Sequence, residues 1–262
     1  MFPKIFKPFF IKKRELVRIG PKEDGGYIVH KKVLKLSNLL ITCGLNDDWR
    51  FEKDFLNKNP KCIVAAYDHT VNLNFWIFYS LKSFYHLLIF KKLRLRKIFD
   101  FLKFVKYIFF FSHPNRHFVK KISQKDNAKE ISILSIMQKY QMYKNIILKI
   151  DIEGDEYQIL NQIKKNQRHI NCLVIEFHNV SKKLKILKKF IKENNLLKLI
   201  HIHGNNYDLT EQGKAESLEM TFLNKNFVKI SKKLSKFSYP IKNLDYPNLK
   251  RRNDVHLKFD EK

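Results

Sequence analysis

The segment 148–160, LKIDIEGDEYQIL, constrains the fold of this chain most strongly, because it joins a strand pattern directly to a helix pattern. A continuous apolar run ends at Asp151, and beyond Gly154 apolar residues recur with helical spacing from Tyr157 to Ile163. These patterns predict a buried strand that turns into a helix. Open α/β sheets bind their ligands at the carboxyl ends of such strands, so the segment also marks a candidate site.

The four acids of this segment have different expected surroundings. Asp151 and Glu153 leave one face of the strand end, because strand side chains alternate. Asp155 and Glu156 fall in the first helical turn, where the helix dipole favours acids, and we expect both to cap the helix and to be solvated. A carboxylate at the end of a central strand is poorly solvated, so we expect Asp151 to have a partner, which is a backbone N–H, an ion or a ligand.

The chain has 262 residues, of which 44% are hydrophobic, enough for one large α/β domain or two small ones. No internal repeat and no Gly/Ser linker interrupts it, which favours a single domain over residues 1–262. The three cysteines, Cys43, Cys62 and Cys172, lie far apart and form no C-x-x-C pair. They are expected to be reduced core residues, not a disulfide framework or a zinc site.

The first fifteen residues are interrupted by Pro3 and Pro8 and lack a continuous apolar region with a cleavage site, so we expect no signal peptide. No stretch of 18 or more uncharged apolar residues occurs, so no segment is expected to cross a membrane. The expected location is the cytoplasm, with peripheral binding to the inner face of the membrane as a further expectation.

The charge balance is strongly basic, with 52 Lys and Arg against 25 Asp and Glu, a net charge of +27. A field of this sign attracts nucleic acid, anionic lipid or acidic glycans. The codon bias of an AT-rich genome, which also yields abundant Lys, Ile, Asn and Phe, explains the charge equally well.

Residues 39–68 contain the two strands and the helix of half a nucleotide-binding unit. Leu39–Cys43 is an apolar strand pattern, Gly44 interrupts it, and a helix pattern begins near Trp49. A second strand pattern ends at Asp68, 24 positions after Gly44, close to the spacing at which a strand-end acid binds ribose hydroxyls. The G-x-G-x-x-G spacing is missing, and a surface acid before a turn is the alternative interpretation of Asp68.

Residues 71–121 have a different composition, with eleven Phe, eleven Lys or Arg, and a single acid, Asp100. Aromatic residues at 90, 99, 101 and 104 alternate with basic ones, which indicates an amphipathic helical insertion at about 71–124. Such a segment fits an anionic membrane interface, a lid over an acceptor site, or an ordinary packed insertion. RNA binding is not favoured, because no exposed aromatic platform with a recognisable motif occurs.

The remaining patterns alternate strands with helices, which predicts a mostly parallel sheet with an antiparallel edge. The strands are expected at 15–30 (two short strands around a turn), 172–178, 197–203, 218–223 and 255–259. Glu176 and His178 share one face at the carboxyl end of the strand 172–178.

The ordered motifs EDGGYIV, CGLNDDWRFE, YDHT, LKIDIEGDEYQIL, VIEFH, HIHGNNY, EMTFL and LDYPN together resemble the FkbM-type methyltransferases. The match extends from about residue 15 to residue 259, excluding the basic insertion. The resemblance implies a Rossmann-like class I fold with a seven-stranded sheet and helices on both faces. It also implies S-adenosylmethionine as cofactor and methyl transfer to an oxygen, in several relatives a sugar hydroxyl. A glycan or glycolipid, or another small molecule, is therefore the expected acceptor, with nucleic acid not favoured.

The resemblance and the positions of the acids together give the candidate site residues. We assign cofactor binding to Gly44, Asn46, Asp47, Glu52 and Asp68, with Asp68 on the ribose. The proton of an acceptor hydroxyl needs a base, and the candidates, in order, are Asp151, His178 and Glu153.

Two alternatives stay open at this point. No metal is assigned, although a divalent ion that orients the acceptor has a plausible ligand set in Glu153, Glu176, His178 and His203. Each histidine is also explained as a hydrogen-bonded structural residue. The alternative function is a non-catalytic basic protein of the same fold that binds an anionic membrane surface or nucleic acid.

Overall fold

A seven-stranded sheet forms the centre of this computed structural model, which describes residues 1–89 and 102–260. The strands lie in the order β10-β11-β9-β8-β3-β4-β5. Their bounds are β3 (Leu39–Cys43), β4 (Ile63–Tyr67), β5 (Arg116–Phe118), β8 (Ile146–Ile150), β9 (Ile170–Phe177), β10 (Leu197–Gly204) and β11 (Leu218–Asn224).

The strand order identifies the fold class. Counted along the chain, the strands of the sheet lie in the order 3-2-1-4-5-7-6, which begins like a doubly wound nucleotide-binding sheet. β11 is antiparallel to both of its neighbours, β9 and β10, and the other pairs of adjacent strands are parallel. The predicted Rossmann-like, mostly parallel seven-stranded fold is therefore confirmed. The antiparallel strand β11 lies one place in from the edge of the sheet, and β10 forms that edge.

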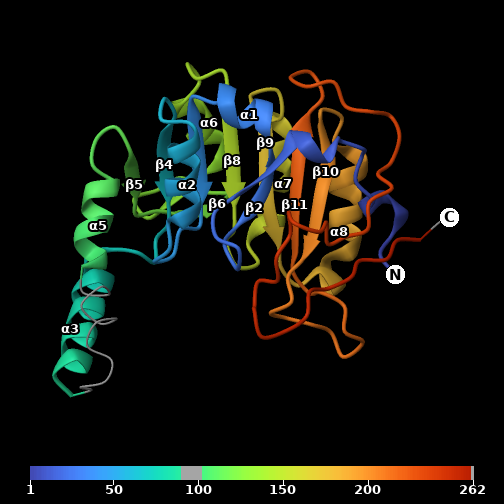
Figure 1. The fold of residues 1–262 in the computed structure, drawn as a ribbon. Coiled ribbons are helices and arrows are strands. Elements are labelled where there is room, and N and C mark those ends of the chain that lie inside the picture. Colours follow the sequence, from blue (N-terminus) through green and yellow to red (C-terminus); the bar gives the residue numbers. More distant parts are fainter. Residues whose placement is uncertain (90–101, 261–262) are drawn as a thin grey trace.

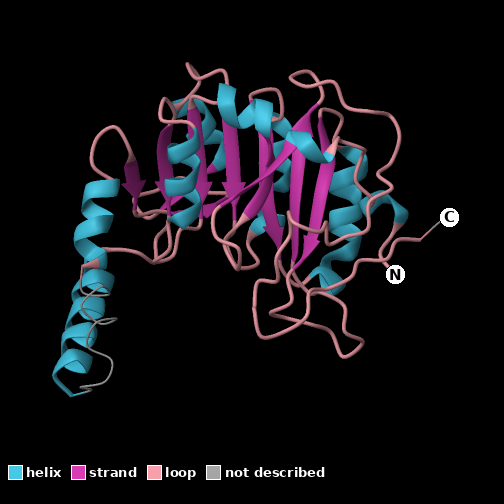
Figure 2. Ribbon diagram, in the orientation of Figure 1, coloured by secondary structure: helices cyan, strands magenta, loops and turns pink. Residues whose placement is uncertain are grey.

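Helices cover both faces of the sheet, as Figures 1 and 2 show. One face carries α1 (Lys31–Leu36), α2 (Arg50–Lys58) and a hairpin of β1 (Leu16–Ile19) and β2 (Tyr27–His30). The other face carries α6 (Ile133–Lys139), α7 (Glu156–Asn166) and α8 (Val180–Glu193). The smaller elements are η1 (Lys4–Phe6), η2 (Lys13–Glu15), β6 (Lys121–Ser123) and β7 (Glu130–Ser132).

The central strands are buried along their whole length because helices cover both of their faces. Every residue of β3, β8 and β9 is buried, as the continuous apolar runs of these segments predict. Cys43, Cys62 and Cys172 are buried free thiols, so the predicted reduced core cysteines are confirmed. Lys149 is also buried, but it is the one charged residue in the otherwise apolar strand β8.

The basic aromatic segment is only partly an insertion. Two helices, α3 (Leu73–Ile89) and α5 (Lys103–Phe110), extend away from the body at the lower left of Figure 1. The expected window 71–124 also contains β5, which pairs with β4 and belongs to the central sheet. The aromatic positions 90, 99 and 101 lie outside the described residues, and Phe104 lies in α5.

One predicted strand is wrong. Residues 255–259 form no strand, because only single bridges, Tyr239 to Leu257 and Phe2 to Phe259, connect them to the rest of the chain. Within residues 1–89 and 102–260, no helix combines the length and the hydropathy that crossing a bilayer requires.

Candidate active site

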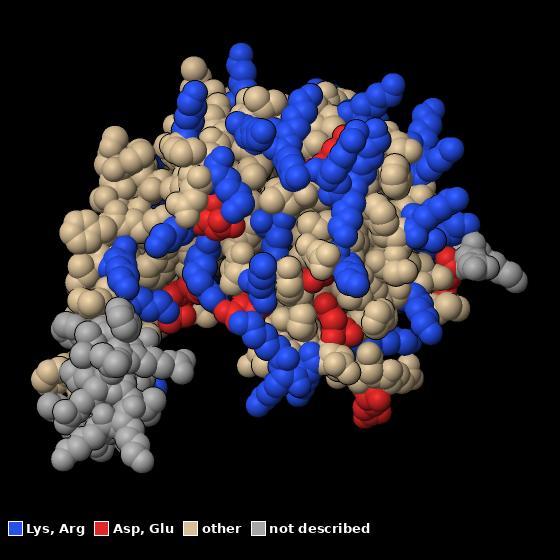
Figure 3. Space-filling view, viewed as in Figure 1, with Lys and Arg blue, Asp and Glu red and all other residues tan. Residues whose placement is uncertain are grey.

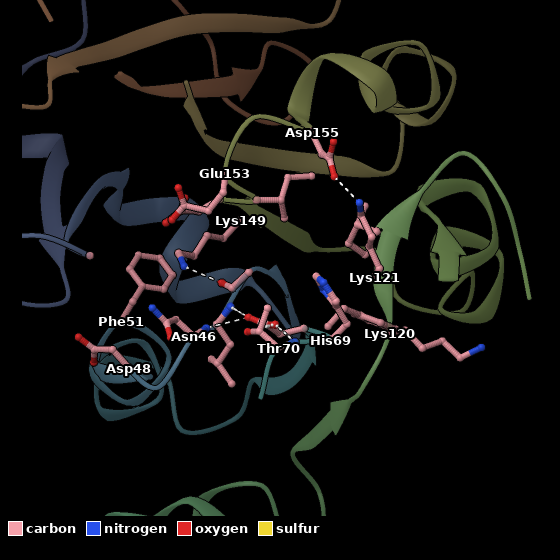
Figure 4. Close-up of a pocket in the computed structure, with 18 of the residues that line it drawn as sticks. Asn46, Asp48, Phe51, His69, Thr70, Lys120, Lys121, Lys149, Glu153 and Asp155 are labelled. Atoms are coloured by element: carbon pink, nitrogen blue, oxygen red, sulfur yellow. Dashed lines mark hydrogen bonds and ion pairs between the residues drawn. The ribbon is translucent and has the colours of Figure 1, made fainter. Parts of the chain in front are cut away.

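A pocket of about 410 Å³ opens outside the carboxyl ends of β3, β4 and β8 (Figure 4). β3 lies between β4 and β8 in the sheet, so the strand order reverses at this point. Open α/β sheets bind ligands in the crevice at such a position. Gly44, Asp68 and Asp151, which the sequence predicts at one shared edge, all line the pocket.

Gly44 forms a wall of the pocket with its backbone. Its φ of 86° is a conformation that favours glycine, and a Cβ here would lie 1.6 Å from the carbonyl oxygen of Asp151. The Gly44 carbonyl accepts a hydrogen bond of 3.2 Å from Nζ of Lys149. The Asp151 N–H donates to the Cys43 carbonyl at 2.8 Å, so the ends of β3 and β8 are fixed against each other.

Asp68 holds the loop that follows β3. Its Oδ2 accepts hydrogen bonds from the backbone N–H groups of Leu45 (2.7 Å) and Asn46 (2.8 Å). Its Oδ1 accepts from the N–H (2.7 Å) and the hydroxyl (2.6 Å) of Thr70. Burial raises the pKa of the Asp68 carboxyl, but these hydrogen bonds together lower it below its usual value. Asp68 is therefore ionised and orders the loop, and a ribose hydroxyl would have to replace one of the four donors.

The other predicted cofactor-binding residues divide into two groups. Asn46 lines the pocket with a positive φ of 50°. Asp47 and Glu52 are not among its lining residues. Asp47 accepts a hydrogen bond of 2.5 Å from Nζ of Lys103 in α5. Glu52 is fully buried, accepts a hydrogen bond of 2.8 Å from the Thr42 hydroxyl and faces Lys149 at 3.9 Å.

Four basic side chains that were not predicted as site residues also line the pocket. They are Arg50, Lys120, Lys121 and Lys149. Only Lys149 carried a signal in the sequence, as a lysine inside an apolar strand. Lys121 pairs with Asp155 at 2.9 Å across the pocket (Figure 4). Figure 3 shows Lys and Arg side chains spread over the face in view, with few Asp and Glu between them, so basic character alone does not mark the site.

Tyr27 in β2 joins Asp151 to Glu176. Its hydroxyl lies 3.0 Å from Oδ2 of Asp151 and 3.0 Å from Oε2 of Glu176. One hydroxyl proton cannot serve both carboxylates at once. Burial, together with the charges of Asp151 and Glu219, raises the pKa of Glu176 well above its usual value. Asp151 thus has a partner, but the partner is a tyrosine hydroxyl and not the backbone N–H, ion or ligand that the sequence leads us to expect.

Glu156 was expected to be a solvated helix cap, and this prediction is wrong. Its side chain is fully buried, and Oε1 accepts hydrogen bonds from the N–H groups of Ile152 (3.2 Å) and Gly154 (3.0 Å) and lies 2.9 Å from Nδ1 of His178. Glu156 therefore caps the turn from inside and orients His178. Asp155 keeps a partly exposed side chain, paired with Lys121.

His178 presents its second ring nitrogen to three carboxylates. Nε2 lies 3.9 Å from Asp151, 3.6 Å from Glu153 and 3.8 Å from Glu176. Burial lowers the pKa of His178, but the hydrogen bond with Glu156 and the neighbouring carboxylates raise it to about 9. The free imidazole is then mostly protonated near neutral pH, which favours Asp151 over His178 as a base.

His203 does not join the other three residues of the predicted alternative ion site. Its ring is buried, with Nδ1 3.0 Å from Glu219 and Nε2 2.9 Å from Asp254. Both ring nitrogens therefore have protein partners. Asp151 takes the place of His203 beside Glu153, Glu176 and His178.

No family model matches the chain. No curated protein matches it either. Among solved structures, a precorrin-6y C5,15-methyltransferase from Geobacter metallireducens is 13% identical, with 74% of this chain and 86% of that chain covered and a TM-score of 0.37. A Methanococcus jannaschii fibrillarin pre-rRNA processing protein is 12% identical (73% and 68% covered, TM-score 0.37). M. jannaschii TYW2 in complex with AdoMet is 11% identical (79% and 87% covered, TM-score 0.34). Because these TM-scores are below 0.5, the strand order, not these similarities, defines the fold.

Proposed function

We propose that this protein is a methyltransferase that uses S-adenosylmethionine to methylate a hydroxyl oxygen. The observation that carries the proposal is the convergence of Gly44, Asp68 and Asp151 on one pocket at the point where the strand order reverses. The FkbM-type resemblance of the sequence supports the same activity and extends it to the class of acceptor.

The pocket suits a cofactor with a nucleoside at one end and an amino acid at the other. Its volume of about 410 Å³ lies within the range of small-molecule sites, about 300–1,000 Å³. Gly44 lets the ends of β3 and β8 approach each other closely beside the pocket, because a Cβ would overlap the Asp151 carbonyl oxygen. In the proposed arrangement the loop Gly44–Asn46 contacts the aminoacyl end, and Asp68 binds the ribose in exchange for one of its present donors. When bound, the cofactor supplies an electrophilic methyl group.

Asp151 is the proposed base. A hydroxyl is a poor nucleophile until its proton is accepted, and a positioned base contributes typically about 10²–10⁴-fold. Asp151 lines the pocket, and Tyr27 holds its Oδ2, which leaves Oδ1 3.9 Å from Nε2 of His178. This arrangement fixes the orientation of the carboxylate.

The exposed apolar side chains of the projecting helices support the proposal that the acceptor, such as a glycolipid, lies at a membrane surface. On α3, Leu73, Ile77 and Leu81 recur every four residues and are 65%, 49% and 62% exposed. Neither α3 nor α5 contains an acid, which suits an anionic bilayer. Trp76 of α3 is buried against Tyr107 of α5, with ring centroids 4.7 Å apart. Lys103 of α5 bonds Asp47, which links the helices to the loop beside the pocket.

Titration of the purified protein with S-adenosylmethionine and with its demethylated product tests the proposal. Binding of both, with an increase in the unfolding temperature, is the expected result, because a ligand that binds only the folded state stabilises it. Absence of stabilisation by either compound at millimolar concentration contradicts the cofactor assignment.

The acceptor is tested separately by following radiolabelled methyl groups into lipid extracts, free glycans and RNA. Label in the lipid or glycan fraction is the expected result. Label in RNA, with a steep loss of binding as salt increases, would support a nucleic-acid acceptor instead. Binding to anionic vesicles without any cofactor binding would support the non-catalytic alternative.

A further inference from the structure

Three side chains at the carboxyl ends of β8 and β9 each direct one donor atom toward a common point. They are Asp151, Glu153 and His178, and the three donor atoms all lie within 4.8 Å of one another. From this geometry we propose that these residues bind one divalent cation of the Mn²⁺ or Mg²⁺ type at the rim of the pocket.

The distances between the donor atoms suit a shared ion and not direct hydrogen bonds. Nε2 of His178 is 3.6 Å from Glu153 and 3.9 Å from Asp151, and both distances exceed the normal hydrogen-bond range. Two ligands held about 2.1 Å from one ion lie about 3.0 Å apart at right angles and about 4.2 Å apart when opposite. Both distances from His178 lie between these two values, as expected for two ligands of one ion.

A second observation, independent of the cluster, concerns the orientation of the histidine. Glu156 is fully buried and lies 2.9 Å from Nδ1 of His178, so Nδ1 carries the proton of that bond and Nε2 points toward the carboxylates. Metal-binding histidines are held in this way by a carboxylate on the other ring nitrogen. Glu156 also bonds the N–H groups of Ile152 and Gly154, so one residue fixes both the imidazole and the backbone around Glu153.

The backbone at Glu153 adds to this arrangement. Glu153 has a φ of 55°, which is uncommon for a residue with a side chain, and its side chain is 86% exposed. An exposed carboxylate can approach an ion without a change in the core. Asp151 is fixed differently, because Tyr27 holds its Oδ2 at 3.0 Å and leaves Oδ1 toward His178.

The donor set determines the class of ion. Two carboxylates and one imidazole suit a hard or intermediate divalent cation, and the absence of thiolate among these three ligands argues against a soft one. Three protein ligands leave further coordination positions for water or for an oxygen of a ligand. Because Asp151 and Glu153 line the pocket, those positions face it. If the proposed function holds, the ion would orient the acceptor oxygen, and Asp151 Oδ1 would then act as a ligand of the ion and not as a free base.

The experiment is a Mn²⁺ titration of the full chain without cofactor, followed by calorimetry and by pulsed electron paramagnetic resonance. One Mn²⁺ per chain is expected, with coupling to a ¹⁴N nucleus from the imidazole. Glu153→Gln should weaken Mn²⁺ binding at least tenfold. Because the Glu153 side chain is exposed, this variant should still fold, so weaker binding would not result from unfolding. His178→Asn should remove the ¹⁴N coupling. The matched control is Asp155→Asn, which changes a carboxylate two residues from Glu153 and should bind Mn²⁺ like the wild type.

Several results overturn the proposal. They are no saturable Mn²⁺ site at millimolar concentration, equal affinities of the Glu153→Gln and Asp155→Asn variants, or ¹⁴N coupling that persists in His178→Asn. Because the titration uses no S-adenosylmethionine, its outcome is separate from that of the cofactor assignment. Mn²⁺ binding without cofactor binding would leave the ion site standing and refute only the proposed function.

Discussion

The carbonyl oxygen of Asp151 lies 1.6 Å from the place that a Cβ on Gly44 would occupy. This close approach joins the ends of β3 and β8, two adjacent strands whose carboxyl ends lie at the pocket. It explains why a glycine stands at this turn although the longer glycine-rich pattern is missing.

Gly44→Ala is expected to disrupt the pocket. The added methyl group meets backbone, which cannot move aside as a flexible side chain can, and the positive φ adds strain of about 1–3 kcal/mol. We expect a lower free energy of unfolding in urea and loss of S-adenosylmethionine binding. Gly213→Ala is the matched control, since Gly213 has a φ of 70° but no atom within 4 Å of its Cβ position. If both variants bind the cofactor equally well, the close approach does not shape the site.

Asp68→Asn is expected to loosen the loop after β3. The amide nitrogen of asparagine accepts no hydrogen bond, so either the N–H groups of Leu45 and Asn46 or the N–H of Thr70 lose their acceptor, and of these donors the Leu45 N–H is the buried one. Unsatisfied buried groups cost about 1–3 kcal/mol each. Calorimetry should show cofactor affinity reduced at least tenfold. Glu193→Gln, at the end of α8, should behave like the wild type, and an Asp68→Asn variant with normal affinity would refute the role of Asp68.

His203 is expected to make the free energy of unfolding fall as the pH rises above neutral. Burial lowers the pKa of its imidazole, but Glu219 and Asp254 raise it well above the usual value. Stability from such a group is complete below the unfolded pKa of about 6.5 and is lost as pH rises through the folded pKa. In that window each pH unit lowers the free energy of unfolding by about 1.4 kcal/mol.

Urea unfolding at a series of pH values above about 6.5 measures this slope. His203→Gln should be less stable by about 3–5 kcal/mol, because Glu219 and Asp254 lose their cation, and should lack the contribution of His203 to the slope. His256→Gln, which changes an exposed ring, should keep the wild-type slope. An unchanged slope in His203→Gln would show that the imidazole is neutral.

The exposed side of α3 is expected to bind anionic bilayers. Ile77→Ser with Leu81→Ser removes two side chains that each contribute about 1.5–3 kcal/mol when buried, so vesicle affinity should fall at least tenfold. Sedimentation with phosphatidylglycerol vesicles measures this affinity. Leu36→Ser, 49% exposed on α1, is the control and should bind normally. Equal binding by the double variant would assign vesicle binding to another surface.

Much of the sheet could be predicted from the sequence because its strands are buried on both faces. Leu39–Cys43 and Ile146–Ile150 are therefore continuous apolar runs, and glycine or acids follow them. The three-residue strand β5 was missed, since Arg116–Phe118 lies in a basic aromatic segment without alternation. Residues 255–259 resemble a strand locally but have no continuous partner, and pairing of that kind depends on distant residues.

Part of the candidate site could also be predicted, because the strands themselves were predicted. Strand ends located Gly44, Asp68 and Asp151, because parallel strands carry their carboxyl ends to one edge. The contacts of Tyr27, which approaches from β2, depend on tertiary packing that no local pattern indicates. In the sequence Glu156 does not differ from other acids in a first helical turn. Its burial and its hydrogen bond with His178 therefore could not be predicted from its position in the sequence.

A crystal structure of the protein with S-adenosylmethionine tests the central claim most directly. The expected result is the ribose beside Asp68, the aminoacyl end against the loop Gly44–Asn46, and the methyl group facing the space in front of Asp151. Cofactor bound anywhere else, or a pocket that stays closed to it at saturating concentration, would contradict the proposed site.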